Sequence, residues 1–321
     1  MGIKILHLKS MSKKFISIIS PCYNEEENVE EFYRRVVEVI NRLSEYNFEF
    51  IFIDNASTDN TVDILKVIAE KDRQVKIIVN NRNFGHIRSP YWGILQTKGD
   101  ATIYLASDLQ DPPEMIPEFI SSWESGYKVV LAVKPVSGGN PLMHFFRRTY
   151  YRLLDGISDI PLTKDATGFG LYDKNVVDEL RKINDPYPYL RGLIDELGYP
   201  LSTIDFVQPR RIRGFTKNNF YALYDIAMLG IVSHSMVPIR LASFLGILIG
   251  LLSILSAFGI ALAKFLWWES FAVGAASIWL VIFAMFGLIM IFIGILGEYV
   301  GVIHNHVRDR PIVVEKERVN F

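Results

Sequence analysis

The sequence of 321 residues predicts an α/β domain with a mostly parallel, doubly wound sheet, followed by two long apolar helices. Two observations predict this fold class. Short apolar runs alternate with amphipathic stretches over residues 15–207, which is typical of strands joined by helical crossovers. Two later runs, residues 241–263 and 270–297, contain no Asp, Glu, Lys or Arg and hold the apolar excess of a chain that is 50% hydrophobic.

The predicted strands are short apolar runs bounded by turn residues, at residues 15–20, 48–53, 75–79, 101–106 and 128–133. The amphipathic stretches between them predict helices at residues 27–44, 59–70, 87–98 and 113–125. In the first helix Val29, Phe32, Val36 and Val39 share one face, which predicts that this face covers the sheet. Such sheets bind ligands at the carboxyl ends of their strands, so we expect the chemistry in the loops that follow the strands.

Each charge-free run is long enough to form a helix that crosses a hydrocarbon core of roughly 30 Å. A buried hairpin in a soluble core is the alternative, but core helices usually show a polar stripe and these runs show none. The connector carries Trp267 and Trp268, which suit a membrane interface. Basic residues flank the pair, including Arg240, Arg308 and Arg310, so the positive-inside rule predicts a multi-pass inner-membrane protein with both termini in the cytoplasm.

These patterns predict four parts of the chain. Residues 1–218 form a cytoplasmic domain, residues 219–237 an interfacial helix, residues 238–303 the two membrane helices, and residues 304–321 a cytoplasmic tail. The glycine-bearing faces of the membrane helices could also associate, which would make a homo-oligomer.

Charge and motif content exclude several classes of protein. Lys and Arg number 34 against 35 Asp and Glu, so the chain carries no basic footprint for nucleic acid. The single cysteine, Cys22, excludes an intramolecular disulfide framework. The sequence has no glycine-rich GxGxxG or GxxxxGK[ST] loop, which argues against a dinucleotide oxidoreductase or a P-loop enzyme, and no HExxH or CxxC pattern for zinc.

Four loops that follow predicted strands are polar, at residues 21–27, 54–61, 81–86 and 107–114. Each loop alone could be a helix cap or a turn, because Asx and Ser are common in both. Four such loops at one edge of one sheet indicate a ligand site instead.

The motifs in these loops resemble a known family. The succession Ser20-Pro21-Cys22-Tyr23-Asn24-Glu25-Glu26, Ile53-Asp54-Asn55-Ala56-Ser57-Thr58-Asp59, Asn83-Phe84-Gly85-His86 and Asp108-Leu109-Gln110-Asp111-Pro112-Pro113-Glu114 is similar to the nucleotide-sugar domain of family 2 glycosyltransferases with a GT-A fold. More narrowly, it resembles the polyisoprenyl-phosphate glycosyltransferases, the group of dolichol-phosphate mannose synthase and the bactoprenol glucosyltransferases. The segments Leu296-Gly297-Glu298-Tyr299-Val300-Gly301 and Arg308-Asp309-Arg310-Pro311 are similar to the end of the second membrane helix in that group.

The resemblance implies an inverting transferase that moves one sugar from a nucleoside diphosphate sugar, favoured as a UDP-sugar, to a polyprenyl phosphate such as undecaprenyl phosphate for cell-envelope glycans. It implies that the nucleoside is bound by residues of the first two loops, namely Pro21, Tyr23, Glu25, Asp54 and Asn55. It also implies that Asp108 and Gln110 bind Mg²⁺ or Mn²⁺, which prefer oxygen ligands. Asp108 is then the principal residue of the reaction.

The sequence departs from the family pattern at three places. Ala106 stands where the family usually has the first acid of Asp-x-Asp-Leu-Gln, and Asn55 replaces the second acid of Asp-Asp-Gly-Ser. Gly168 and Gly170 replace the acid and the base of Gly-Asp-Phe-Arg-Leu, which bears on the acceptor.

The nature of the acceptor decides whether a general base is needed. A phosphate monoester has a second pKa of about 6, so it is already nucleophilic at neutral pH and needs positioning rather than deprotonation. Arg210, Arg211 and Lys217 form a basic loop that we expect to hold this phosphate, although the same residues would also serve as positive-inside anchors. An acceptor hydroxyl would instead need a carboxylate base. The candidates for that base are Asp165, Asp195 and Glu196. A third hypothesis is a catalytically silent membrane scaffold that binds a nucleotide sugar.

Overall fold

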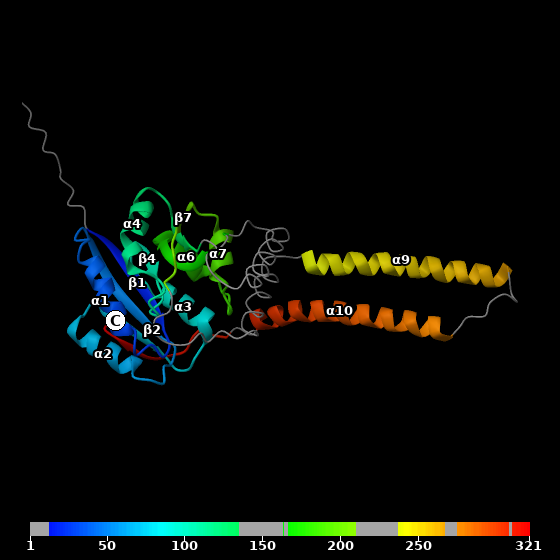
Figure 1. Ribbon diagram of the computed structural model, residues 1–321, viewed down its shortest axis with the longest axis horizontal. Coiled ribbons are helices and arrows are strands. Elements are labelled where there is room, and N and C mark those ends of the chain that lie inside the picture. Colours follow the sequence, from blue (N-terminus) through cyan, green and yellow to red (C-terminus); the bar gives the residue numbers. More distant parts are fainter. Residues whose placement is uncertain (1–12, 135–162, 164–165, 210–236, 267–274, 308–309) are drawn as a thin grey trace, which may run out of the picture. The chain divides into compact units, whose positions relative to one another are not determined.

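The structure is a computed structural model that describes residues 13–134, 163, 166–209, 237–266, 275–307 and 310–321 (Figure 1). The chain divides into two compact units. The first comprises residues 1–146, 162–217 and 309–321 and contains the sheet, and the second comprises residues 147–161 and 218–308 and contains two long helices.

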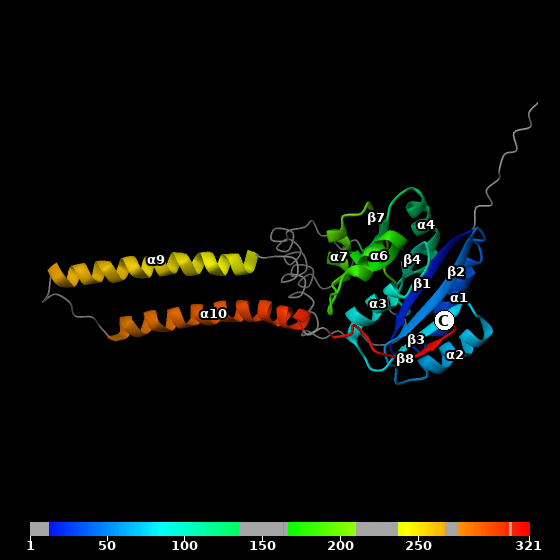
Figure 2. The same cartoon turned by 180° about the vertical axis from the view of Figure 1, so that it is seen from behind.

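The first unit is built on one mixed sheet of eight strands, in the order β7-β5-β6-β4-β1-β2-β3-β8 (Figures 1 and 2). The strands are β1 (Lys14–Cys22), β2 (Tyr46–Asp54), β3 (Val75–Asn80), β4 (Ala101–Tyr104), β5 (Val129–Val133), β6 (Ala166–Asp173), β7 (Leu201–Asp205) and β8 (Glu315–Val319). The pairs β1–β2, β1–β4, β2–β3 and β5–β7 are parallel. The predicted α/β class with a mostly parallel sheet is therefore confirmed, and so are the five predicted strands.

The sheet differs from the doubly wound parallel sheet expected from strand–helix alternation in the direction of two strands. β6 runs antiparallel to both of its neighbours, β4 and β5, and β8 runs antiparallel to β3. Alternation of short apolar runs with helices does not reveal such strands, because direction depends on which partners a strand meets in the fold.

The described residues of this unit form these helical segments beside the sheet: α1 (Val29–Ile40), α2 (Thr61–Lys71), α3 (Gly85–Leu95), the 3-10 turn η1 (Pro113–Met115), α4 (Ile116–Glu124), α6 (Lys174–Lys182) and α7 (Leu190–Leu197). The four helices expected from amphipathic stretches are confirmed as α1, α2, α3 and α4, with shorter bounds. α6 and α7 were not among the predicted elements.

The alternation of strand side chains builds two core layers. On one face Ile18 and Phe52 pack with Phe32 of α1, Leu65 of α2 and Phe119 of α4. On the other face, the neighbouring strand residues Ile19 and Ile53 pack with helix residues of α3, α6 and α7, namely Tyr91, Ile94, Val176, Leu180 and Leu193. Helices α1, α2 and α4 thus cover one face of the sheet, and α3, α6 and α7 cover the other.

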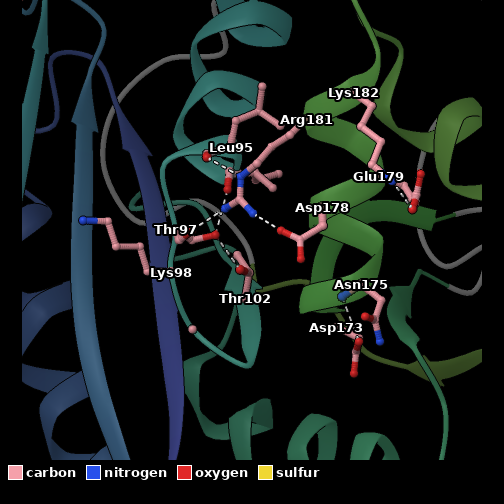
Figure 3. A network of polar contacts seen from close by, with 12 residues as sticks. Leu95, Thr97, Lys98, Thr102, Asp173, Asn175, Asp178, Glu179, Arg181 and Lys182 are labelled. Carbon is pink, nitrogen blue, oxygen red and sulfur yellow. Dashed lines mark hydrogen bonds and ion pairs between the residues drawn. The ribbon is translucent and has the colours of Figure 1, made fainter.

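Arg181 fastens α6 to the end of α3 (Figure 3). Its Nε donates to the carbonyl oxygen of Leu95 at 3.0 Å, and its Nη2 donates to the carbonyl oxygen of Thr97. Its Nη1 forms an ion pair with Asp178 on the same helix. The last carbonyl groups of a helix lack partners within the helix, so this arginine satisfies them while it joins two elements.

Residues 315–319, expected as part of a tail, form β8 and extend the sheet (Figure 2). Trp92 Nε1 donates to Glu315 Oε1 at 2.5 Å, and Asn320 Nδ2 donates to the carbonyl oxygens of Ala69 and Val75, both at 2.8 Å. β3 would otherwise be an edge strand with unpaired backbone groups, and the charged strand Glu315–Val319 covers that edge.

The second unit contains α9 (Val237–Leu266) and α10 (Ala275–Val307), of 30 and 33 residues, which contact each other. They correspond to the two charge-free runs, so the prediction of two long helices is confirmed. Among the residues that the structure describes, no helix has the length and apolar content needed to cross a membrane. The membrane-spanning part of the prediction is thus not confirmed. The predicted interfacial helix at residues 219–237 lies outside the described residues except for its last position.

Candidate active site

The loops that follow the parallel strands meet at one edge of the sheet. In the β1–β2 pair the last residues, Cys22 and Asp54, lie opposite each other. The backbone N–H of Asn55 donates to the carbonyl oxygen of Cys22 at 2.9 Å. Ser107 Oγ, after β4, donates to the carbonyl oxygen of Pro21 at 2.9 Å. The prediction that these polar loops share one edge is confirmed.

The loops after β1 and β2 hold each other through reciprocal hydrogen bonds. The N–H of Asn24 donates to Ser57 Oγ at 2.8 Å, and Asn24 Oδ1 accepts from the N–H of Thr58 at 2.7 Å. The N–H of Glu25 donates to Thr61 Oγ1 at 2.8 Å. Because polar side chains of one loop satisfy backbone groups of the other, the two loops form one rigid unit.

The resemblance implies nucleoside contacts for Pro21, near the end of β1, and for Tyr23 and Glu25 in the loop that follows it. Pro21, Tyr23 and Glu25 are all half-buried at this edge. Glu25 Oε2 accepts a hydrogen bond from Asn28 Nδ2 at 2.6 Å, which orients the carboxylate. An aromatic ring, a proline and an oriented carboxylate together suit a planar base and a ribose hydroxyl, through apolar contact and hydrogen bonding respectively.

Asp54 has a supporting role in the structure. Its side chain is fully buried, and both carboxylate oxygens accept from Ser57: Oδ2 from the backbone N–H at 2.9 Å and Oδ1 from the hydroxyl. Burial raises the pKa of Asp54, although the hydrogen bonds from Ser57 oppose this shift. The direct contact with a base that the resemblance implies for Asp54 stays a prediction.

Asn55 links the loop after β2 to the loop after β3. Its Nδ2 donates to Asn83 Oδ1 at 2.9 Å and to the carbonyl oxygen of Gly85 at 3.2 Å. Its Oδ1 accepts from Asn80 Nδ2 at 3.2 Å and from the N–H of Phe84 at 2.8 Å. All four hydrogen bonds of a primary amide are thus made within the protein, so Asn55 joins the two loops. The nucleotide contact expected of Asn55 from the sequence stays a prediction.

Backbone strain is concentrated in these loops. Asn24, Ala56 and Leu109 have φ values of 53°, 62° and 61°, and among the described residues the only other non-glycine residue with positive φ is Asn320. The left-handed region costs a residue with a Cβ roughly 1–2 kcal/mol. Such strain tends to collect at functional sites, where surrounding contacts hold the backbone in place.

The loop after β4 carries the predicted metal ligands. Asp108 is half-buried, and its Oδ1 accepts from the N–H of Gln110 at 3.1 Å. Asp111 is buried, and its Oδ2 accepts from the N–H of Ala106 at 2.9 Å. Burial raises the pKa of Asp111 to about 7, and the negative charge of Asp108 adds to the rise. Ala106, which lacks the family's first carboxylate, thus contributes a backbone donor that holds Asp111.

The oxygen donors of this loop fit a divalent cation only in part. Among the described residues, no group of three or more Asp, Glu, His or Cys side chains could hold a metal ion alone. Asp108 and Gln110 offer one carboxylate and one amide oxygen, which are ligands that Mg²⁺ and Mn²⁺ accept. Burial is the main reason that the pKa of Asp111 is raised, and the negative charge of Asp108 adds to it. These residues therefore fit a cation that shares its remaining ligands with a bound diphosphate.

The residues predicted for the acceptor side are only partly described. Asp165, Arg210, Arg211 and Lys217 lie outside the described residues. Glu196 is exposed on α7. Asp195 accepts from Thr163 through both oxygens, from the N–H at 2.7 Å and from Oγ1 at 2.6 Å. Asp195 thus forms a hydrogen-bonded pair with Thr163, and the role of Asp195 or Glu196 as a base stays a prediction.

One residue that the sequence analysis did not select is Arg191 of α7. Its Nη2 donates to the carbonyl oxygen of Thr167 at 3.2 Å. Burial raises the pKa of Tyr104 at the end of β4; the charges of Asp111 and Asp108 raise it further, and the charge of Arg191 opposes them. Arg191 is thus a cation close to the acidic loop. No local motif marks it, because α7 reaches this position only through the fold.

The two glycines that depart from the family pattern, Gly168 and Gly170, have different surroundings in the structure. Gly170 lies in β6, and a Cβ built on it would lie 2.1 Å from the carbonyl oxygen of Val130 in β5. Gly168 has φ +89° and open space around it. No side chain fits at Gly170 in this sheet, which explains the absence of the basic residue that the family pattern has there.

Comparison with known proteins gives a consistent result. Residues 17–181 match the family described as Glycosyl transferase family 2. The uncharacterized glycosyltransferase YkcC of Bacillus subtilis is 35% identical over 302 residues, which are 93% of this chain and 92% of the relative. The SfII prophage-derived bactoprenol glucosyl transferase of Shigella flexneri is 30% identical over 303 residues, 94% of this chain and 97% of the relative. The solved mannosyltransferase PcManGT from Pyrobaculum calidifontis, in complex with GDP-Man and Mn²⁺, has a TM-score of 0.46 at 15% identity and covers 94% of this chain and 89% of that chain.

Proposed function

Because the chain belongs to glycosyl transferase family 2, we propose that it transfers a single sugar, with inversion, from a nucleoside diphosphate sugar to a polyprenyl phosphate. We favour a UDP-sugar as the donor and undecaprenyl phosphate as the acceptor, in the synthesis or modification of cell-envelope glycans. The relative named as a bactoprenol glucosyl transferase supports this choice of lipid, since it matches nearly the whole length of both chains.

The observation that carries the proposal is the convergence of the acid-bearing loops at the carboxyl ends of β1, β2 and β4. Tyr23 and Glu25 lie on the loop after β1, and Asp108 and Gln110 lie on the loop after β4. The hydrogen bond from Ser107 to Pro21 fixes these two loops beside each other. A nucleoside pocket and an oxygen-ligand site are then adjacent, as the binding of a nucleoside diphosphate requires.

The chemistry follows from the acceptor and from the geometry of these loops. An oxygen of the lipid phosphate attacks the anomeric carbon of the sugar, the bond from that carbon to the donor diphosphate breaks, and the nucleoside diphosphate leaves with the electron pair. A phosphate monoester, largely dianionic at neutral pH, needs no general base. Tyr23 and Glu25 orient the nucleoside, which holds the donor for in-line attack.

A divalent cation would be held by Asp108 and Gln110. When bound, it supplies positive charge that stabilises the departing diphosphate. Asp111, buried behind this loop, keeps the backbone of Ala106 in place through its hydrogen bond and so positions the two ligands.

Transfer to a hydroxyl acceptor is less well supported. It would require a carboxylate base. Both oxygens of Asp195 are already used by Thr163, and Glu196 is exposed on α7.

We also propose that the enzyme works at the cytoplasmic face of a membrane. The support comes from the sequence, namely the charge-free runs at residues 241–263 and 270–297 and their basic flanks. An acceptor that is itself a membrane lipid requires such a location.

The test is a transfer assay with the full-length protein. A panel of radiolabelled UDP- and GDP-sugars is offered with undecaprenyl phosphate and Mg²⁺ or Mn²⁺, and the label in the organic phase is counted. We expect lipid-extractable label with one donor, and at least a hundredfold less with Asp108→Asn, because one ligand to the cation is weakened. Asp63→Asn is the matched control, since Asp63 is an exposed residue of α2.

The outcomes separate the hypotheses. Label that stays in the aqueous phase for every donor would contradict the proposal and favour a silent nucleotide-sugar-binding scaffold. Transfer that is equal in Asp108→Asn and in the control would contradict the role of Asp108.

A further inference from the structure

Three arginines gather at the start of α3, although they come from distant parts of the chain. Arg82 and Arg88 both lie over the ring of Phe84, with their guanidinium carbons 4.1 Å and 5.3 Å from its centroid. Arg310 is brought near by the C-terminal segment, because Arg88 Nη2 donates to the carbonyl oxygen of the next residue, Pro311, at 2.6 Å. All belong to the compact unit that contains the sheet.

The C-terminal segment is held firmly in this position. The N–H of Asn81 donates to the carbonyl oxygen of Val314 at 2.9 Å, and the strand pairing of β8 with β3 begins at Glu315, opposite Asn80. The residues that follow Arg310 are therefore anchored beside the loop that carries Arg82. The cluster is a fixed feature of the fold rather than a chance approach of surface side chains.

The arginines of the cluster have no acidic partner among the residues that the structure describes. In the part of the chain that the structure describes, Arg82, Arg88 and Arg310 form no ion pair. Other arginines of the same unit do pair with acids: Arg34, Arg35, Arg181 and Arg318. The hydrogen bonds of the cluster go instead to backbone carbonyl groups, from Arg82 Nη1 to Asn83 at 3.0 Å and from Arg88 to Pro311.

The lack of acids has a physical cost. Burial lowers the pKa of Arg88, and the positive charges of Arg82 and Arg310 lower it further, while the side chain of Tyr187 acts in the opposite direction. Arginine stays protonated in proteins, so the repulsion is not relieved by loss of a proton. Arg88 Nε is also buried without a hydrogen-bond partner. A bound anion would remove the repulsion.

The adjoining backbone suits an anion of several oxygens. α3 begins at Gly85, directly after Phe84, whose side chain cannot cap the helix. The N–H of Gly85 donates to Asn83 Oδ1 at 2.8 Å, so the N–H groups considered for an anion are those that follow it in the first turn. The first N–H groups of a helix carry partial positive charge and bind phosphate oxygens readily. Guanidinium groups add charge-assisted hydrogen bonds whose geometry matches phosphate.

We propose that Arg82, Arg88 and Arg310, together with the first turn of α3, form a binding site for a phosphate monoester group. Arg82 and the first turn of α3 belong to the segment after β3, whereas Asp108 belongs to the loop after β4. The proposal concerns phosphate binding alone and does not rest on the proposed function. The phosphate can come from a soluble molecule or from a lipid headgroup, and both sources present the same oxygens to the arginines.

The test measures phosphate binding to the full-length protein in detergent by calorimetry. Inorganic phosphate is the probe, and EDTA is present so that no divalent cation can hold phosphate at Asp108. We expect Arg310→Gln and Arg82→Gln each to weaken binding about tenfold or more, because each removes hydrogen bonds to a charged group. Arg310 is exposed and makes no hydrogen bond to lose among the described residues, so its replacement tests the site even if Arg88→Gln unfolds the protein.

Arg34→Gln is the matched control, because it removes the same charge from an arginine that is already paired with Glu31 and Glu38. Binding that is unchanged in Arg34→Gln and weakened in the cluster variants supports the site. No binding to the unaltered protein, or equal weakening in Arg34→Gln, would overturn it. The assay contains no sugar donor, so its outcome does not depend on glycosyl transfer.

A second arm identifies the source of the phosphate. Phosphatidic acid in the detergent micelles competes with inorganic phosphate if a lipid headgroup is the ligand, whereas phosphatidylcholine with the same acyl chains does not. Competition that disappears in Arg310→Gln supports a lipid source. Absence of competition, with phosphate binding retained, supports a soluble one.

Discussion

Asn55 offers the sharpest test of how the site is built. It makes four hydrogen bonds that join the loops after β2 and β3. Asn55→Ala removes all four, at about 1 kcal/mol each, so we expect a loss of about 4 kcal/mol in the stability of this junction. Asn55→Asp keeps the two accepting bonds but places an oxygen where Nδ2 donated to Asn83 and Gly85. Because two hydrogen bonds are lost and a charge is buried, we expect the stability of the junction to fall by about 2–4 kcal/mol at neutral pH.

The two variants should differ in their response to pH. The pKa of an aspartate at position 55 is raised in the folded protein, because burial and two facing acceptors favour the protonated form. Measured against the unsubstituted protein, Asn55→Asp therefore regains stability as the pH falls toward about 3.9, the pKa of an aspartate in the unfolded chain. It loses this stability again as the pH rises through the pKa of the aspartate in the folded protein. Asn55→Ala introduces no titrating group, so its loss of stability should not change with pH.

Hydrogen exchange measured by mass spectrometry reads out this junction directly, since the N–H of Phe84 donates to Asn55. After correction for intrinsic rates, exchange of peptides that contain Phe84 should be faster by about thirtyfold or more in Asn55→Asp at neutral pH. Asn41→Asp, an identical change at an exposed residue, is the control. Exchange in Asn55→Asp that matches the control, or that follows the same pH course as Asn55→Ala, would refute the reasoning.

Three further predictions concern the backbone and the thiol of the same domain. Ala56→Gly should stabilise the protein by about 1 kcal/mol, seen as a higher unfolding temperature, because the φ of 62° is strained only for a residue with a Cβ; a lower temperature would contradict the strain. Gly170→Ala should destabilise by about 3 kcal/mol or more, because its Cβ would lie 2.1 Å from the backbone oxygen of Val130. Gly168→Ala, where nothing lies within 4 Å, should cost only about 1–2 kcal/mol, and equal effects in urea unfolding would argue against the clash. Cys22 should resist iodoacetamide in the native protein and react after unfolding, because burial raises the pKa of its thiol; mass spectrometry of the labelled protein decides this, and rapid native labelling would show that the thiol is accessible.

Local patterns were sufficient to predict the α/β class, the first five strands and the helices that follow the first four of them. An apolar run such as residues 75–79 or a polar loop such as residues 107–114 has its character set by near neighbours in the chain. The polar loops also indicated where the site lies, because parallel strands that are each followed by a helix end at the same edge of their sheet. Tyr23, Glu25 and Asp108, which the family resemblance singled out within these loops, lie at that edge in the structure.

The structural roles of Asp54 and Asn55 depended on which groups their side chains meet in the fold. Asp54 and Asn55 have the residue types expected of ligand contacts. In the structure the side chain of Asp54 accepts hydrogen bonds from Ser57, and the side chain of Asn55 forms hydrogen bonds with the loop after β3. A sequence pattern shows that a residue can donate or accept. It does not show whether another part of the protein has already taken that capacity.

The sequence by itself determined the family, the first five strands with the helices that follow the first four of them, and the edge of the sheet that carries the polar loops. Only the tertiary structure decided that β6 enters the sheet antiparallel, that residues 315–319 return to pair with β3, and that Arg310 joins Arg82 and Arg88. The physical reason is separation along the chain. Periodicity and turn chemistry act over a few residues. The pairing of β6 with β4 joins residues about 70 positions apart, and the pairing of β8 with β3 joins residues more than two hundred positions apart, so nothing in the neighbouring sequence encodes the partner.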